Sequence, residues 1–76
     1  MEKHYHAHLI RFGGSLNPES NQWTPTLMVF WNEGGETISK QILFKSTFTT
    51  EANAQVRAYD FAITWIDAGK PEIASS

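Results

Sequence analysis

The sequence predicts a small α+β domain in which a three-stranded antiparallel meander is followed by one C-terminal helix. Residues 23–31 and 37–45 are rich in β-branched and aromatic residues, and the pair Gly34-Gly35 separates them as in a tight hairpin. Residues 51–68 instead place apolar residues at helical spacing. The chain has 76 residues, so we expect a single domain spanning residues 1–76.

The three strands are expected between clear turn signals. The first covers about residues 4–12, where aromatic, β-branched and polar residues mix. A loop over residues 13–22 follows, because glycine, proline, asparagine and serine supply turn chemistry there. The second strand, residues 23–31, has Pro25 near its start, where a missing amide donor is easily tolerated. The third strand covers about residues 37–45 and completes the meander.

The helix, expected over about residues 51–68, has recognisable signals at both ends. Thr49 or Thr50 can cap the free amides of the first turn. Gly69 can take the left-handed conformation that ends a helix, and a proline two residues later cannot continue it. Residues 72–76 are expected to form a frayed tail.

Alternation in the second and third strands separates a core face from an outer face. The core face holds Trp23, Pro25, Leu27, Val29, Trp31, Ile38, Ile42 and Phe44. Lys40 shares that face, and an inward-pointing lysine on an edge strand discourages further strand pairing. In the first strand we place Tyr5, Ala7 and Leu9 inward, because three buried imidazoles would leave unpaired polar groups that cost about 1–3 kcal/mol each.

The outer face of the predicted sheet then carries a row of histidines beside apolar residues. We nominate it as a candidate interface or ligand site, with the members His4, His6, His8, Ile10, Phe12, Met28 and Phe30. His-x-His spacing on a strand can also hold zinc, so His4, His6 and His8 are a weak metal alternative. At roughly 3.3 Å per residue the first and third rings lie about 13 Å apart, too far to share one ion easily. Three protonated imidazoles would repel, which also allows a pH-responsive interface.

The predicted helix has more apolar surface than one small sheet needs. One stripe should lie on the sheet and consists of Ala54, Ala58, Phe61, Ala62 and Trp65. A second stripe continues around the helix and consists of Val56, Tyr59, Ile63 and Ile66. This surplus predicts contact with another copy of the chain. The alternative is that the long loop and the C-terminal tail fold over the second stripe.

Composition argues against several function classes. The formal net charge is −2 and the six basic residues are spread thinly, which disfavours binding to phosphate backbones. The chain has no cysteine, and therefore no disulfide framework or thiolate zinc site. We find no catalytic motif, so we expect neither an enzyme nor a cofactor. No apolar run approaches transmembrane length and no signal peptide is apparent, so we expect a cytoplasmic protein without membrane contact.

The leading functional prediction is a non-enzymatic interaction or regulatory module that acts as a homodimer, with another protein as the alternative partner. A second prediction is single-stranded nucleic-acid binding by aromatic residues of the open sheet face. The passage from Phe48-Thr49-Thr50-Glu51-Ala52 through Trp65-Ile66-Asp67 resembles the strand-to-helix passage of small bacterial β-β-β-α domains, including HicB-type antitoxin domains. This resemblance implies a toxin-neutralising, partner-binding role, although the P-D-x-P-G signature of HicB proteins is absent.

Overall fold

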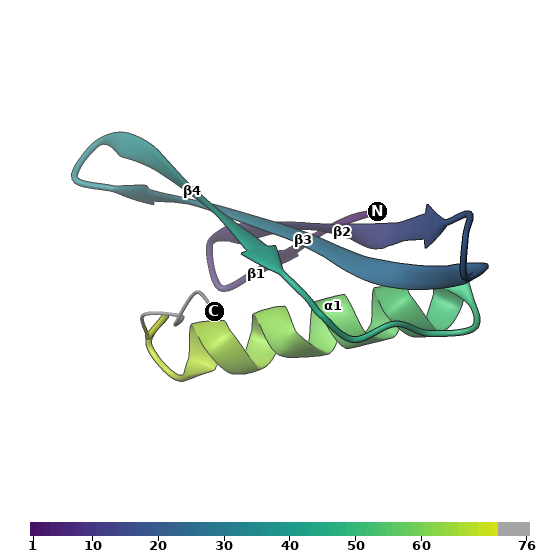
Figure 1. Cartoon of the computed structure of the whole chain (residues 1–76). Helices are drawn as coiled ribbons and strands as arrows, with labels where there is room; N and C mark the ends of the chain where they lie inside the picture. The colour runs from purple at the N-terminus through teal and green to yellow at the C-terminus, as the bar shows by residue number, and fades with distance from the viewer. Residues whose placement is uncertain (72–76) are drawn as a thin grey trace.

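A computed structural model describes residues 1–71 of the chain and shows four antiparallel strands and one helix (Figure 1). The elements are β1 (Glu2–Tyr5), β2 (His8–Asn17), β3 (Gln22–Glu33), β4 (Glu36–Leu43) and α1 (Glu51–Asp67). The strands lie in the sheet in chain order, and α1 packs across one face against β2 and β3. The α+β class and the C-terminal helix are confirmed, but the sheet has four strands instead of three. Within residues 1–71 we find no helix long and apolar enough to cross a membrane.

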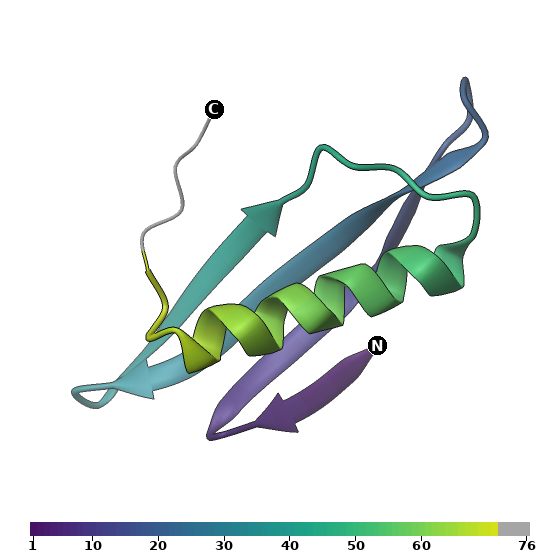
Figure 2. The ribbon, with the colours of Figure 1, turned by 90° about the horizontal axis from the view of Figure 1, so that it is seen from below.

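The additional strand arises because the segment expected as one strand over residues 4–12 folds back on itself. His6 and Ala7 form the turn, with φ angles of 47° and 63°. Positive φ at both central residues is typical of the two-residue hairpin turn that matches the twist of paired strands. β1 therefore lies antiparallel to β2, with Lys3 opposite Ile10 (Figure 2).

This turn changes which side chains of the first segment face the helix. The prediction that Ile10 and Phe12 lie on the outer face is wrong, because both are buried in the core, with exposed fractions of 0% and 6%. Leu9 lies on the opposite face and Ala7 lies in the exposed turn, so neither points inward as predicted. Tyr5 does face the helix, since its hydroxyl reaches the C-terminal end of α1.

β2 and β3 extend into the segment expected as a loop over residues 13–22. Only residues 18–21 connect the two strands. Gly14 lies within β2, where a Cβ atom would come within 3.2 Å of the Cβ atom of Ala54. A glycine inside a strand often marks such a close approach of another element. The glycine therefore reflects the packing of α1 on the sheet and not a turn.

The predicted register of the β3–β4 hairpin is confirmed. Gly34 and Gly35 form its turn, with φ angles of 60° and 84°. Val29 lies opposite Lys40, which places Lys40 on the helix side of the edge strand β4. Lys40 stays exposed at that edge, where a lysine discourages pairing with a further strand.

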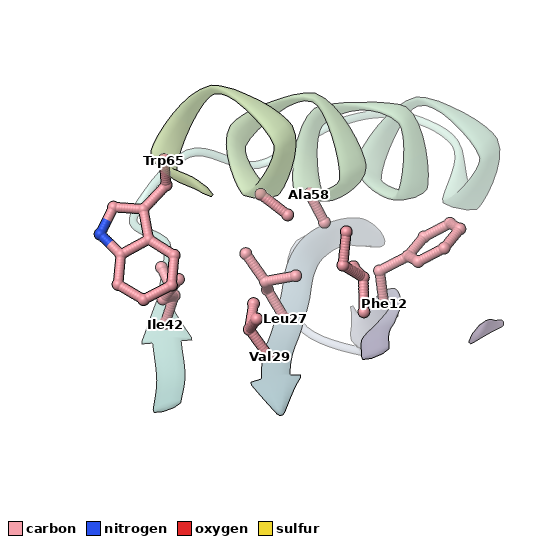
Figure 3. Close-up of a cluster of buried hydrophobic side chains, with 8 residues drawn as sticks. Phe12, Leu27, Val29, Ile42, Ala58 and Trp65 are labelled. Atoms are coloured by element: carbon pink, nitrogen blue, oxygen red, sulfur yellow. The ribbon is translucent and has the colours of Figure 1, made fainter. Parts of the chain in front are cut away.

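The core lies between α1 and the inner face of the sheet (Figure 3). Its buried members are Ile10, Phe12, Leu27, Val29, Ile42, Ala54, Ala58, Ala62 and Trp65. The small alanine side chains let α1 lie close to the strands, and burial of the larger side chains contributes about 25 cal/mol per Å². Phe61, predicted on the same stripe, is only half-buried and packs edge-on against Phe44 with ring centroids 5.3 Å apart.

Both ends of α1 follow the signals in the sequence. Thr50 is the N-cap, and its hydroxyl accepts a hydrogen bond from the backbone N–H of Asn53 at 3.2 Å. This bond satisfies one of the amides that the first turn leaves free. Gly69 lies just beyond the helix with a φ of 86°, the conformation expected for a helix stop. The tail predicted at residues 72–76 lies outside the described residues.

Candidate interaction site

A groove of about 420 Å³ lies between β1 and one side of α1. Its lining residues come from the first two strands, with the residue before β1, and from α1, and they are Met1, Lys3, Phe12, Gln55, Val56, Tyr59, Asp60 and Ile63. Two apolar members, Met1 and Val56, are 67% and 68% exposed. Neighbouring exposed apolar side chains of this kind are typical of an interaction site. We call this surface the β1–α1 groove.

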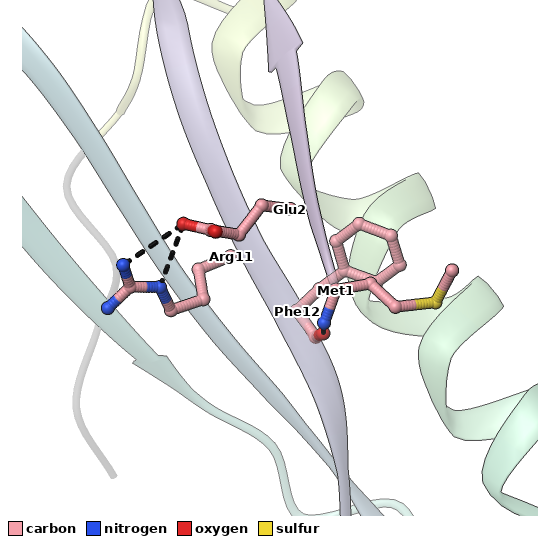
Figure 4. Close-up of polar contacts among 4 residues, drawn as sticks. All are labelled: Met1, Glu2, Arg11 and Phe12. Carbon is pink, nitrogen blue, oxygen red and sulfur yellow. Dashed lines mark hydrogen bonds and ion pairs between the residues drawn. The ribbon is translucent and has the colours of Figure 1, made fainter.

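The groove exists because β1 is held alongside β2. The amino group of Met1 donates a hydrogen bond to the carbonyl of Phe12 at 2.8 Å, and the N–H of Phe12 donates to the carbonyl of Met1 at 2.8 Å (Figure 4). Glu2 and Arg11 form an ion pair of 3.0 Å between the same two strands. These contacts keep β1 at the edge of the sheet, where its side chains reach α1.

Tyr59 links the buried and the charged parts of the groove. Its ring centroid lies 5.1 Å from that of Phe12, and the Nζ atom of Lys3 lies 5.1 Å from the Tyr59 centroid. An ammonium group over an aromatic ring gains about 0.5–1 kcal/mol at an exposed site. The positive charge of Lys3 is therefore held on the β1 side of the groove.

The opposite wall carries a negative charge. Asp60 projects from α1 with a side chain that is 72% exposed, and its carboxylate lies 4.0 Å from the guanidinium of Arg57. An exposed ion pair of this length contributes little to stability, so Asp60 keeps most of its capacity to bind another cation. The groove thus has the Lys3 ammonium and the Met1 amino group on its β1 side and the Asp60 carboxylate on its α1 side, with apolar side chains between them.

Three of the four residues in the predicted surplus stripe of the helix line this groove, namely Val56, Tyr59 and Ile63. Ile66 does not line it, because its side chain is half-buried against the core. Tyr59 and Ile63 are also half-buried, and the ammonium group of Lys3 from β1 lies over the ring of Tyr59. The sequence also allowed the segment 13–22 or the C-terminal tail to fold over this stripe. Among residues 1–71, no residue of the segment 13–22 lines the groove. The tail lies outside the described residues.

The structure separates the three histidines that the sequence places in one row. His4 lies on the outer face opposite Leu9, and His6 occupies the turn. His8 lies on the helix side, where its ring centroid is 5.7 Å from that of Trp31. The prediction of a single row is wrong, because the turn interrupts the alternation. In the described part of the chain, no group of three or more His, Asp or Glu side chains is arranged to hold a metal ion.

The outer face of the sheet is a second candidate surface. Its apolar members are Leu9, Met28, Phe30 and Leu43. The guanidinium carbon of Arg11 lies 5.3 Å from the ring centroid of Phe30. A shallow depression of about 350 Å³ includes His4 and Phe30. Of the residues predicted for this face, His4, Met28 and Phe30 lie on it, whereas Ile10 and Phe12 are in the core.

Sequence reasoning missed Met1, Lys3, Gln55 and Asp60 as members of the groove. Lys3 lies in β1 and Met1 directly precedes it, whereas the strand expected over residues 4–12 began after both. The only available signal was a pair of residues, His6-Ala7, between two short strand-like runs. Such turns are normally recognised by Asn-Gly, Asp-Gly or Gly-Gly, and none of these occurs there.

Comparisons with known proteins identify no relative for this chain. No family model, no curated protein and no solved structure matches it. The groove and the outer face are therefore the observations on which a functional proposal can be based.

Proposed function

We propose that the protein is a non-enzymatic interaction module that acts as a homodimer, with the β1–α1 groove as its contact surface. The observation that supports this most directly is an open strand edge beside an exposed apolar groove. β1 is the terminal strand of the sheet and pairs only with β2 among the described elements. The outward backbone groups of such an edge are a ready template for another strand.

The charges of the groove favour a second copy of the chain as the occupant. In a two-fold symmetric dimer the same patch meets itself, so each contact occurs twice. An axis at the groove would bring Lys3 of each copy towards Asp60 of the other, and it would cover the exposed side chains of Met1 and Val56. An unrelated partner would have to supply both charges in matching positions.

The small core is consistent with association. A domain of this size buries only about 60% of the surface that its unfolded chain exposes. Three of the nine buried apolar residues in the described chain are alanines, which add little volume. Small domains without disulfides often gain stability by oligomerising. Because the sequence has no cysteine, the proposal requires no oxidising compartment, and we propose a cytoplasmic location.

A charge exchange tests the proposed contact. Sedimentation equilibrium should show a dimer at micromolar concentrations. Lys3→Glu and Asp60→Lys should each raise the dimer dissociation constant about tenfold, which corresponds to about 1.4 kcal/mol. The double variant carries both reversed charges and should recover most of the wild-type affinity, because each pair again has opposite signs.

Lys40→Glu is the matched control, since it makes the same change on the other edge strand. It should leave the dimer dissociation constant unchanged. A wild-type protein that is monomeric at these concentrations would overturn the homodimer. If Lys40→Glu weakened the dimer and Lys3→Glu did not, the protein would still self-associate, but the contact surface would lie at β4 and not at the β1–α1 groove.

A second candidate function is binding of single-stranded nucleic acid on the outer face. The observation in its favour is the stacking of Arg11 on the half-exposed ring of Phe30, because a base can stack on such a ring. The net charge of −2 and the burial of Phe12 count against it. The test is binding of a fluorescent single-stranded oligonucleotide at several salt concentrations. Binding that weakens with salt and that Phe30→Ala abolishes would support this function. An absence of binding would contradict it.

A further inference from the structure

The sheet has a second open edge at β4, on the side opposite to β1 (Figure 2). Among the described elements β4 pairs only with β3, and α1 makes its main contacts with β2 and β3. Six of the eight residues of β4 are exposed. At roughly 3.3 Å per residue the strand extends about 26 Å, which is long enough to pair with a peptide segment of similar length.

A depression of about 390 Å³ lies on the helix side of this edge. Among its lining residues are Trp31, Glu33, Lys40, Trp65 and Lys70. The indole rings of Trp31 and Trp65 lie edge to face, with centroids 6.0 Å apart. The depression therefore places two ammonium groups beside a pair of aromatic rings, next to the backbone edge of β4.

Within residues 1–71, neither ammonium group of the depression forms an ion pair with a carboxylate. The Nζ atom of Lys70 lies 3.0 Å from the Nε2 atom of His8 and 4.4 Å from the ring centroid of Trp31. Lys40 is exposed at the edge. Glu33 also lines the depression, and its carboxylate accepts a hydrogen bond from the indole of Trp31 at 3.2 Å. The two positive charges therefore exceed the negative charge of Glu33 and favour an anionic group at this edge.

We propose that β4 binds an acidic peptide in extended conformation, which adds to the sheet as a fifth strand and places a glutamate or aspartate side chain beside Lys40. The backbone of the peptide pairs with the outward N–H and C=O groups of the edge, as in other complexes formed by strand addition. This proposal goes beyond the homodimer, because it uses the other edge of the sheet and a different partner.

The charge of Lys40 gives the site its selectivity. A lysine on an edge strand disfavours pairing with most strands, and like charges directly opposite each other on two strands are destabilising. Opposite charges in the same positions stabilise the pair, so a carboxylate beside Lys40 turns an unfavourable contact into a favourable one. The ammonium group of Lys70 in the same depression adds to the attraction.

The opposite face of β4 adds a second requirement. Leu43 lies on the outer face, three residues after Lys40, and is 81% exposed. Because side chains alternate between the two faces of a strand, the peptide residue beside Leu43 is three positions from the acidic residue and points to the outer face. An apolar side chain there covers Leu43. The preferred peptide therefore has an acidic and an apolar residue at this spacing.

A synthetic fluorescent peptide tests the site on the full chain. It has a central glutamate that is followed on each side by threonine, valine, leucine and threonine, so the spacing is present in both directions. Its matched control has lysine in place of the glutamate. Fluorescence anisotropy at about 0.15 M salt, where distant exposed charges are largely screened, should show that the lysine peptide binds about tenfold more weakly.

Lys40→Glu should reverse this preference, so that the lysine peptide binds more tightly than the glutamate peptide. Arg57→Glu is the matched control, because it changes the net charge equally at a residue of α1 that does not line the depression. It should leave both affinities unchanged. In nuclear magnetic resonance spectra, the backbone amides of Ser39 and Gln41 should shift on addition of the glutamate peptide.

The site is wrong if the glutamate peptide does not bind, if both peptides bind equally, or if Arg57→Glu alters the preference as much as Lys40→Glu does. Shifts of the β4 amides that follow the protein concentration without any peptide would assign the edge to a second copy and would also overturn the proposal. The proposed dimer uses β1, so failure of peptide binding at β4 is separate from failure of the proposed function.

Discussion

The hydroxyl of Tyr5 donates a hydrogen bond to the carboxylate of Asp67, with distances of 2.8 and 2.9 Å to its two oxygens. The contact joins β1 to the last turn of α1. This hydrogen bond raises the pKa of the Tyr5 phenol above its usual value, and partial desolvation and the charge of Asp67 act in the same direction. The protonated phenol is therefore the form that the folded protein favours.

Tyr5→Phe should weaken the dependence of stability on alkaline pH. Because the pKa of Tyr5 is higher in the folded protein, the contact contributes fully below the unfolded value of about 10 and is lost as the pH rises through the folded value. Urea unfolding across this range should show a steeper loss for the wild type than for Tyr5→Phe. Tyr59→Phe is the matched control and should retain most of the steep loss, because Tyr59 is the smallest of the causes that raise the pKa of Tyr5. Identical profiles for the wild type and Tyr5→Phe would contradict the assigned contact.

Ile10→Ala should destabilise the protein by about 2–5 kcal/mol, because it leaves a cavity at a fully buried position. Leu9→Ala should cost clearly less, since Leu9 is half-exposed on the outer face. The free energy of unfolding in urea measures both changes. A larger loss of stability for Leu9→Ala than for Ile10→Ala would place Leu9 in the core, as the sequence predicted, and would contradict the turn at His6-Ala7.

Ala7→Gly should raise the free energy of unfolding by about 1 kcal/mol. Ala7 has a φ of 63°, a conformation that costs an L-residue with a Cβ atom roughly 1–2 kcal/mol and costs glycine little. Ala52→Gly makes the same chemical change at an exposed position in the first turn of α1, where it should lower stability by about 0.5 kcal/mol. Thermal unfolding should therefore shift in opposite directions for the two variants. A loss of stability in both would argue against the turn.

Thr50→Ala should lower the free energy of unfolding by about 1 kcal/mol, because it removes the acceptor for the backbone N–H of Asn53. Thr49→Ala is the neighbouring control and should have an effect within about 0.5 kcal/mol of zero. Helical circular dichroism followed through urea unfolding compares the two. Equal losses would show that the cap is at another residue.

Local signals in the sequence predicted a large part of this fold. The turn at Gly34-Gly35 determines that odd-numbered residues of β3 share a face with even-numbered residues of β4, and this places Lys40 on the helix side. Threonine and glycine likewise identified the two ends of α1. These features were predictable because each depends on residues that are neighbours in the chain.

The remaining features depend on contacts between distant residues. The turn at His6-Ala7 contains neither glycine nor asparagine, the residues that usually mark such turns, so its conformation depends on the pairing of β1 with β2. Gly14 suggested a loop, because only the packed structure shows Ala54 above it. The candidate site was predictable on its helix side, through Val56, Tyr59 and Ile63. Its strand side was not, because it required the extra hairpin.

The order of the strands has a consequence for the kinetics of folding. Each strand pairs with its neighbour in the chain, so the sheet can assemble through short loops that close quickly. α1 contacts β2 and β3, and these contacts close much longer loops. Docking of the helix is therefore expected to come late. Changes at Ala58 should then act mainly on the rate of unfolding, whereas changes in the turns should act on the rate of folding. Comparison of both rates for the same variants, as φ-values, measures this order.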